Sequence, residues 1–387
     1  MKKSQRIILI VSACLVLLNA GLLLSGQRHI YATLFYNLPG IDDYTIFHNR
    51  TIQRAPHPQA WSNASVYNKR PLSDSLLKNL EALQTVSFLV IQGDSVLAEK
   101  YWGIGSDRSH TGSFSMSKSF VSALIGRAIA LHYIKSTDQN VGDFIPAFNT
   151  EGRQHITLKH LLLMSSGLGW DEAYSSAFSE TTKAYYGYDL KQQMESLTPV
   201  KKPGVYFEYK SCDTEILALV LTKATGMSVS AFMQQELWQP MGAESDAYWS
   251  LDHADGMEKA YCCISSNARD FARLLKLYTH KGNWNGAQLI DTAFVEASVT
   301  ASGLPEAETG MPTGYYGYQW WVIPDYKGYR IFYMRGILGQ YGIAIPELDC
   351  VIVRLGHKRG EKEKGQPHYP ETFLMIDEAL ALCQKAL

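Results

Sequence analysis

The sequence lacks an excess of charge of either sign. Its 387 residues include 36 basic and 37 acidic side chains, which gives a formal net charge of −1. Nucleic-acid-binding proteins usually carry a basic excess, so this balance argues against a nucleic-acid partner. The densest charged stretch, KRGEKEKG at 358–365, mixes both signs and is typical of a solvated loop.

Cysteine is also scarce. None of the six cysteines belongs to a CxxC motif or to a Cys/His cluster with zinc spacing, so we expect no structural metal site. Cys14 lies in an apolar run, which leaves an odd number of cysteines in the rest of the chain. Cys262 and Cys263 are adjacent, and neighbouring cysteines rarely bridge one another. We therefore expect most of the cysteines to be small buried side chains.

Several common catalytic motifs are missing as well. The chain contains no G-x-S-x-G, H-E-x-x-H, Walker A or G-x-G-x-x-G sequence. GDSV at 93–96 resembles the start of one hydrolase motif, but it falls where the pattern predicts a hairpin turn. These absences argue against the usual serine elbow, zinc protease, nucleotide-hydrolysing and dinucleotide-binding classes.

The chain does contain one long hydrophobic run, at its N-terminus. Ile7–Leu24 is 18 residues long and holds two clearly polar side chains, Ser12 and Asn19. That length is close to a bilayer span and exceeds the usual core of a signal peptide. Three basic residues precede the run and one follows it closely, which predicts a cytoplasmic N-terminus with the rest of the chain outside, on the periplasmic side in a bacterium. We expect an uncleaved membrane anchor, and a cleaved secretion signal is the alternative.

The remaining patterns divide the chain into segments. Residues 1–30 form the expected anchor, and 31–80 are rich in turn-forming residues and predict a linker with loops. The order of helix, strands, helices, strands and final helix over 81–387 predicts an α+β domain. We expect an antiparallel sheet flanked by N- and C-terminal helices, with an all-helical lobe inserted at about 125–295.

Two local predictions are specific. A helix should start near Ser73 or Asp74, because PLSDSLLKNLEALQT combines a capping residue with helical periodicity. Two strands should meet at Gly93 and Asp94, because strand-like runs flank this turn-forming pair.

The stretch GSFSMSKSF at 112–120 raises the question of catalysis. Ser115 and Lys118 are three residues apart, which places them on one face at a helix N-terminus. A desolvated lysine can lose its proton and activate a serine, and helix N-terminal N–H groups face developing negative charge. The spacing alone is weak evidence, since Ser75 and Lys78 share it within an ordinary amphipathic helix.

A second pattern strengthens this interpretation. Tyr209 and Ser211 form a Y-x-S arrangement after a Pro-Gly turn and before a predicted helix. A phenol beside a lysine can relay a proton between nucleophile and leaving group. Tyr174 also begins a Y-x-S sequence, but without the turn and helix around it.

From about residue 85 to its end, the chain resembles the serine β-lactamase and penicillin-binding-protein superfamily. Within that superfamily it is most similar to class C-type esterases and 6-aminohexanoate-dimer hydrolases. SFSMSKSF resembles the first family motif, with Ser115 as nucleophile and Lys118 as base, and YFEYKS resembles the second through Tyr209 and Ser211. ITLKHLLLMSSGLGWDEAY and YCCISSNARDFARLLKLYTHKGNWNG resemble two further family segments in the expected order.

The third family motif differs. Met334-Arg335-Gly336 stands where β-lactamases usually carry Lys/His-Thr/Ser-Gly, so the usual cation and hydroxyl are replaced and Gly336 is retained. Strand alternation predicts that Arg335 points to the opposite face from Met334. The resemblance implies an oxyanion hole formed by the backbone N–H groups of Ser115 and Ile337.

We therefore expect a serine hydrolase that cleaves a small-molecule ester or amide through an acyl-enzyme, with no metal or organic cofactor. One alternative is a β-lactamase or D,D-peptidase in which Arg335 binds the substrate carboxylate. Another is a membrane-anchored binding protein that kept the fold and lost the chemistry. Further candidates for substrate binding are Trp170, Asp171, Tyr174, Ser211, Arg335 and Gly336.

Overall fold

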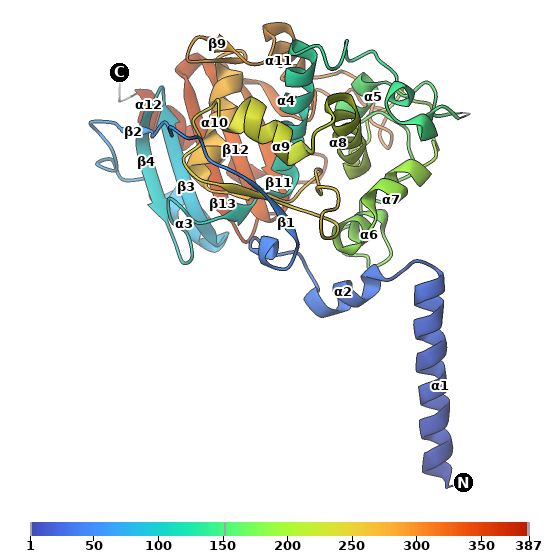
Figure 1. Ribbon diagram of the computed structural model, residues 1–387. Coiled ribbons are helices and arrows are strands. Elements are labelled where there is room, and N and C mark those ends of the chain that lie inside the picture. Colours follow the sequence, from blue (N-terminus) through green and yellow to red (C-terminus); the bar gives the residue numbers. More distant parts are fainter. Residues whose placement is uncertain (1, 151, 385–387) are drawn as a thin grey trace.

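Strands from two distant parts of the chain form one seven-stranded sheet at the centre of the fold (Figure 1). The computed structural model describes residues 2–150 and 152–384. The strand order is β10-β11-β12-β13-β3-β4-β2, antiparallel except for the short β2–β4 pair. Its strands are β2 (Ser62–Asn63), β3 (Thr85–Gln92), β4 (Ser95–Tyr101), β10 (Trp321–Tyr326), β11 (Tyr329–Gly336), β12 (Gln340–Ile345) and β13 (Cys350–Gly356).

Helices cover both faces of this sheet, so its strands are almost continuously apolar. α3 (Asp74–Ala82) and α12 (Pro370–Gln384) pack on one face, and α10 (Ala268–Thr279) lies on the other (Figure 1). The Ser73 side chain caps α3 by accepting a hydrogen bond from Leu76 N, as predicted. β3 and β4 form the predicted hairpin, in which Gly93 takes the left-handed backbone conformation (φ 56°).

The predicted helical lobe lies beside the sheet. It is built from α4 (Ser117–Ala130), α5 (Leu158–Leu162), α6 (Glu180–Tyr186), α7 (Leu190–Ser196), α8 (Ser211–Thr225), α9 (Val229–Met233) and α11 (Thr292–Ser298). Short 3-10 turns lie at Asp43–Thr45, Val141–Asp143, Pro146–Phe148 and Pro346–Leu348, and a π-helical turn lies at Gln234–Trp238. The fold class predicted from the sequence, α+β with a β-lactamase-like arrangement, is confirmed.

Short strands that the sequence patterns did not reveal lie before this helical stretch and within it. β1 (Asn49–Ile52), β6 (Ala247–Ser250), β7 (Ile264–Ser266) and β5 (Thr111–Gly112) form a second sheet in that order, and β8 (Asn283–Trp284) pairs with β9 (Ala287–Gln288). Strands of two to four residues are too short to show a clear alternation of apolar and polar side chains.

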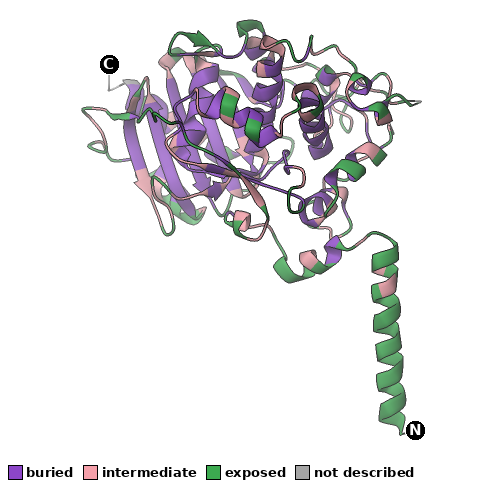
Figure 2. Cartoon of the chain, in the orientation of Figure 1, coloured by how far each residue is buried: buried purple, intermediate pink, exposed green. Residues whose placement is uncertain are grey.

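The N-terminal region consists of two helices. α1 (Lys3–Leu24) extends away from the body, has no buried residue, and is long and apolar enough to cross a membrane (Figures 1 and 2). α2 (His29–Tyr36) follows after four residues and packs against α6. α2 was not predicted from the sequence, because its eight residues fall in a stretch dominated by turn signals.

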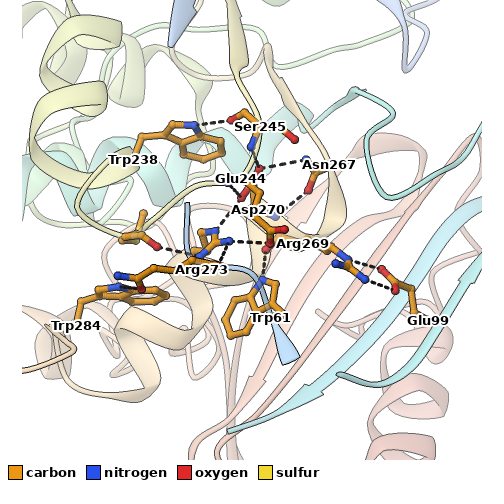
Figure 3. A network of polar contacts seen from close by, with 12 residues as sticks. Trp61, Glu99, Trp238, Glu244, Ser245, Asn267, Arg269, Asp270, Arg273 and Trp284 are labelled. Atoms are coloured by element: carbon orange, nitrogen blue, oxygen red, sulfur yellow. Dashed lines mark hydrogen bonds and ion pairs between the residues drawn. The ribbon is translucent and has the colours of Figure 1, made fainter. Parts of the chain in front are cut away.

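A buried polar network joins α10 to the rest of the domain (Figure 3). Arg269 donates two hydrogen bonds to the Glu99 carboxylate of β4, at 2.7 and 2.6 Å. Arg273 pairs with Asp270 at 2.8 Å and with Glu244 at 2.9 Å. Removing one partner of such a buried ion pair typically lowers the free energy of unfolding by about 3–5 kcal/mol. The network therefore holds α10 against its face of the sheet.

Cys262 and Cys263 are joined by a disulfide, so the prediction that these neighbours do not bridge was wrong. The rarity of such bridges reflects the tight turn that they need. Here Cys263 adopts a left-handed backbone (φ 58°) and its carbonyl accepts a hydrogen bond from Ser250 N, so strand pairing holds the turn. Cys212 and Cys350 are buried free thiols, as expected.

Candidate active site

Ser115 lies in a 3-10 turn, η2 (Phe114–Met116), that leads directly into α4. Phe114 has a φ of 46°, a left-handed conformation that costs a non-glycine residue about 1–2 kcal/mol. A Cβ atom at Gly336 would lie 2.3 Å from the carbonyl oxygen of Ser113, so only glycine allows the end of β11 to approach this turn. This close approach explains why the third motif keeps a glycine at position 336.

Lys118 is fully buried and directed at the serine. Its Nζ donates a hydrogen bond to Ser115 Oγ at 3.0 Å and another to the carbonyl oxygen of Tyr261 at 2.8 Å. Burial lowers the pKa of Lys118 to about 8, although the charges of Glu172 and Glu215 oppose this change. The structure therefore brings together the serine and lysine that the spacing predicted, and burial brings the pKa of that lysine close to neutral pH.

Tyr209 completes a cluster with these two residues. Its ring centroid lies 5.2 Å from Lys118 Nζ, and Ser115 lies close enough to affect its hydroxyl. Burial and the charge of Glu172 raise the pKa of Tyr209 well above its usual range, while the nearby Ser115 hydroxyl acts in the opposite direction. The phenol therefore stays protonated at neutral pH and can donate a proton beside Ser115.

Glu172 connects the neighbouring residues, and the sequence analysis did not single it out. Its carboxylate accepts hydrogen bonds from Ser211 N at 2.7 Å and Ser211 Oγ at 2.6 Å. It also accepts from Trp170 Nε1 at 2.7 Å and from the Tyr174 hydroxyl at 2.5 Å. The sequence signal was an acid within GWDEAY, between two aromatic residues whose N–H and O–H groups need an acceptor.

A second acid is linked to Lys118 through the backbone of Tyr261. Glu215, on α8, accepts a hydrogen bond from Tyr261 N at 3.1 Å, and Tyr261 O in turn accepts one from Lys118. Burial raises the pKa of Glu215 to about 8. Neither Tyr261 nor Glu215 was predicted, because their role depends on a backbone carbonyl that no side-chain pattern records.

Two of the predicted residues lie apart from the serine. Asp171 is exposed, and its backbone N–H donates to Glu180 Oε2 at 3.2 Å. The guanidinium of Arg335 stacks 3.5 Å from the ring centroid of Trp321 and donates to the carbonyl oxygen of Pro367 at 2.9 Å. Arg335 and Met334 point to opposite faces of β11, as strand alternation predicted.

A pocket with a volume of about 260 Å³ opens over Ser115. Ile337, which follows β11, contributes to its wall. The end of α2 forms another part of the wall, which the sequence analysis missed. The lining includes Thr33, Leu34, Leu38, Pro39, Phe114, Ser115, Tyr174, Thr182, Tyr185, Ser211, Tyr261, Cys262 and Ile337.

A second, larger pocket of about 630 Å³ is lined by Tyr209 and Glu172. Its other walls are mostly charged or polar, which contrasts with the apolar pocket over Ser115. They include Trp170, Asp171, Glu208, Lys210, Glu306, Glu308 and Lys362.

The chain is similar in sequence to known proteins. The family model for Beta-lactamase matches residues 74–374. A 6-aminohexanoate-dimer hydrolase from Paenarthrobacter ureafaciens is 30% identical over 324 residues, which are 79% of this chain and 81% of that protein.

Solved structures agree on the fold. A protein from Bacillus anthracis named as a candidate 6-aminohexanoate-dimer hydrolase superposes with a TM-score of 0.75 at 19% identity, over 89% of this chain and 93% of its own. A family VIII carboxylesterase superposes with a TM-score of 0.62 at 16% identity, over 81% of this chain and 96% of its own. The matched region contains all the elements that carry Ser115, Lys118 and Tyr209.

Proposed function

Because the chain belongs to the beta-lactamase family and has an amide hydrolase among its relatives, we propose that it cleaves an ester or amide bond through an acyl-enzyme on Ser115. The observation that carries this proposal is the 3.0 Å contact between Ser115 Oγ and Nζ of the buried Lys118. A lysine held there with a pKa of about 8 is a suitable general base near neutral pH.

In the first step, neutral Lys118 takes the proton of Ser115 as Oγ attacks the substrate carbonyl. The developing oxyanion is stabilised by the backbone N–H groups of Ser115 and Ile337, worth about 3–4 kcal/mol for each donor. Tyr209 donates its proton to the leaving group as the carbonyl–leaving-group bond breaks, and it recovers a proton from Lys118. The product of this step is an ester of Ser115.

In the second step, water attacks the same carbonyl. Lys118 and Tyr209 accept the proton of the water and return one to Ser115 Oγ as the acyl–serine bond breaks. The carboxylic acid product and the free serine are restored. The same two residues thus manage the protons in both halves of the reaction.

The surrounding residues define the proposed substrate site. Glu172 holds Trp170, Tyr174 and Ser211 in place through the hydrogen bonds described above, and Tyr174 and Ser211 line the serine pocket. Gly336 allows the close approach that brings Ile337 into the same wall. We propose that this rigid wall orients a small ester or amide, with Asp171 at the outer edge of the second pocket.

A penicillin-recognising enzyme has less support. That function needs a cation for the substrate carboxylate, and Arg335 is the residue available in the third motif. Its guanidinium is stacked on Trp321, bonded to Pro367, and is not part of the lining of the serine pocket.

We also propose that α1 anchors the enzyme in a membrane with its catalytic domain outside the cytoplasm. The run from Ile7 to Leu24 within α1 carries two clearly polar side chains, no residue of α1 is buried, and basic residues precede this run. The corresponding division is an anchor over residues 1–30, a connecting segment over 31–80 and a hydrolase domain over 81–387. In this division the connecting segment contributes β1 and β2 to the two sheets.

The proposal is tested by intact-protein mass spectrometry after treatment with a fluorophosphonate. One adduct is expected on Ser115 and none on Ser115→Ala. Ser75→Ala is the matched control, because Ser75 and Lys78 share the same sequence spacing on α3. Failure to label the folded wild-type protein would contradict the proposed nucleophile. Stable acylation by a fluorescent penicillin would favour the penicillin-recognising alternative.

A further inference from the structure

The pocket over Ser115 has an unusual wall. One side is formed by the C-terminal half of α2 and the residues after it, including Thr33, Leu34, Leu38 and Pro39. These residues lie 9 to 15 positions after Leu24, the last residue of the helix proposed to cross the membrane. The mouth of the pocket is therefore close in sequence to the anchor, which raises the question of whether it is also close to the membrane in space.

α2 is firmly attached to the catalytic body. His29 Nε2 contacts the carbonyl oxygen of Ala177 at 2.9 Å, and the hydroxyl of Tyr186 donates to Asn37 O at 3.2 Å. The rings of Tyr36 and Tyr186 are stacked, with centroids 6.2 Å apart. Both ends of α2 are thus held, so the position of α2 also fixes the position of the pocket mouth.

The connection to the anchor is short. Four residues separate the end of α1 from the start of α2, which limits the gap between them to about 15–18 Å even if fully extended. The hydroxyl of Tyr31 on α2 also donates to Asn19 Oδ1 on α1 at 2.6 Å, which places α2 beside the last turns of α1. Figure 1 shows α2 lying between α1 and α6, at the level where α1 ends.

The surface formed by the end of α2, the residues after it and the loop around Phe178 is apolar and exposed. Leu34, Phe35 and Leu38 are 77%, 82% and 66% exposed, and Phe178 in the neighbouring loop is 74% exposed. Figure 2 shows the C-terminal end of α2 as exposed. Leu34 and Leu38 are also part of the lining of the serine pocket, so the apolar surface continues from outside the protein into the site. Such a continuous patch beside an anchor matches a bilayer surface better than bulk water.

We propose that this apolar face rests in the outer boundary of the membrane that holds α1, and that the pocket receives the hydrocarbon chain of an ester or amide dissolved in that membrane. This inference rests on the proposed acyl-enzyme function and narrows its substrate class to amphiphiles. The chain of the substrate enters past Leu34 and Leu38, with its carbonyl at Ser115. Its polar leaving group then lies toward Tyr209, which lines the charged second pocket.

The full-length protein in phosphatidylcholine vesicles tests the proposal with two substrates. 4-Methylumbelliferyl acetate reaches the site from water, whereas 4-methylumbelliferyl palmitate is carried in the vesicle membrane. Phe35→Ser is expected to lower the palmitate-to-acetate rate ratio by about fivefold or more, because it removes an apolar membrane contact. Tyr133→Ser is the matched control, since Tyr133 is an exposed aromatic residue beyond the far end of α4, about 20 Å from Ser115, and should leave the ratio within about twofold.

Equal ratios in the wild type and Phe35→Ser would overturn the membrane-entry proposal, and so would acetate cleavage without palmitate cleavage. Loss of cleavage of both substrates, together with no labelling of Ser115, would instead reject the underlying hydrolase function. Because Phe35 is 82% exposed, its replacement should leave thermal unfolding unchanged.

A direct physical measurement supplements the rates. A spin label on Phe35→Cys, in a Cys14→Ser background, should collide more with oxygen than with a water-soluble nickel chelate. The same label on Tyr133→Cys should show the opposite preference. The remaining free cysteines are buried, so labelling is selective. A water-like signal at position 35 in vesicles would contradict the proposal.

Discussion

The protonation of Lys118 should control the rate of the enzyme. Burial lowers its pKa to about 8, and only the neutral amine can accept the proton of Ser115. With that pKa, about one lysine in eleven is neutral at pH 7 and about ten in eleven at pH 9. The value of kcat/KM for a small soluble ester should therefore rise about tenfold between pH 7 and pH 9 and level off at higher pH.

Glu172 provides a second, independent perturbation of the same pKa. Its negative charge raises the pKa of Lys118, against the larger effect of burial. Glu172→Gln removes that charge and keeps an oxygen acceptor for Ser211 and Trp170. The pKa of Lys118 should fall further, and the acidic limb of the pH profile should move to lower pH, whatever happens to the maximal rate.

The assay is the initial rate of p-nitrophenyl acetate hydrolysis, followed at the isosbestic wavelength of the product. Ser115→Ala gives the background at each pH, and Lys118→Met removes the base without adding polarity. Lys118→Met should lose about 10²–10⁴-fold in kcat/KM, with circular dichroism unchanged. A flat profile between pH 7 and pH 9, or a limb that moves to higher pH in Glu172→Gln, would refute the assignment of Lys118 as the base.

Three further predictions follow from the site. Tyr209→Phe should lower kcat by about 10²–10⁴-fold in steady-state kinetics, because the leaving group loses its proton donor; an unchanged kcat would exclude that role. Ile337→Ala should keep kcat within about threefold, because the proposed donor is the backbone N–H, and a loss near the effect of one oxyanion donor would contradict this. Alkylation of the unfolded, unreduced protein should modify four cysteines and spare Cys262 and Cys263, whereas prior reduction should expose all six; six modified cysteines without reduction would disprove the bridge.

Much of the fold and part of the site could be predicted from local sequence. The α3 cap at Ser73 and the hairpin at Gly93 depend on residues adjacent in the chain, so their patterns are readable. The spacing of Ser115 and Lys118 is equally local, and the structure places the two side chains 3.0 Å apart. The family predicted from the order of these motifs is confirmed by the match over residues 74–374.

Other features required contacts between distant segments. Glu172 is the centre of a hydrogen-bond cluster because its loop contacts the start of α8, a contact between segments that are distant in the sequence. The bridge between Cys262 and Cys263 depends on a turn held by strand pairing, which outweighs the general rarity of adjacent disulfides. The short strands β6 and β7 carry no pattern of their own and form because they pair with each other and with β1 and β5.

The sequence by itself thus determined the Ser115–Lys118 motif, the family and the apolar N-terminal helix, since each depends on residues close together in the chain. Only the tertiary structure decided the environment of that motif. Burial of Lys118, which lowers its pKa to about 8, results from packing by segments up to 143 residues away. The same packing brings α2 to the pocket over Ser115, because the end of that helix is held by a tyrosine 149 residues further along the chain.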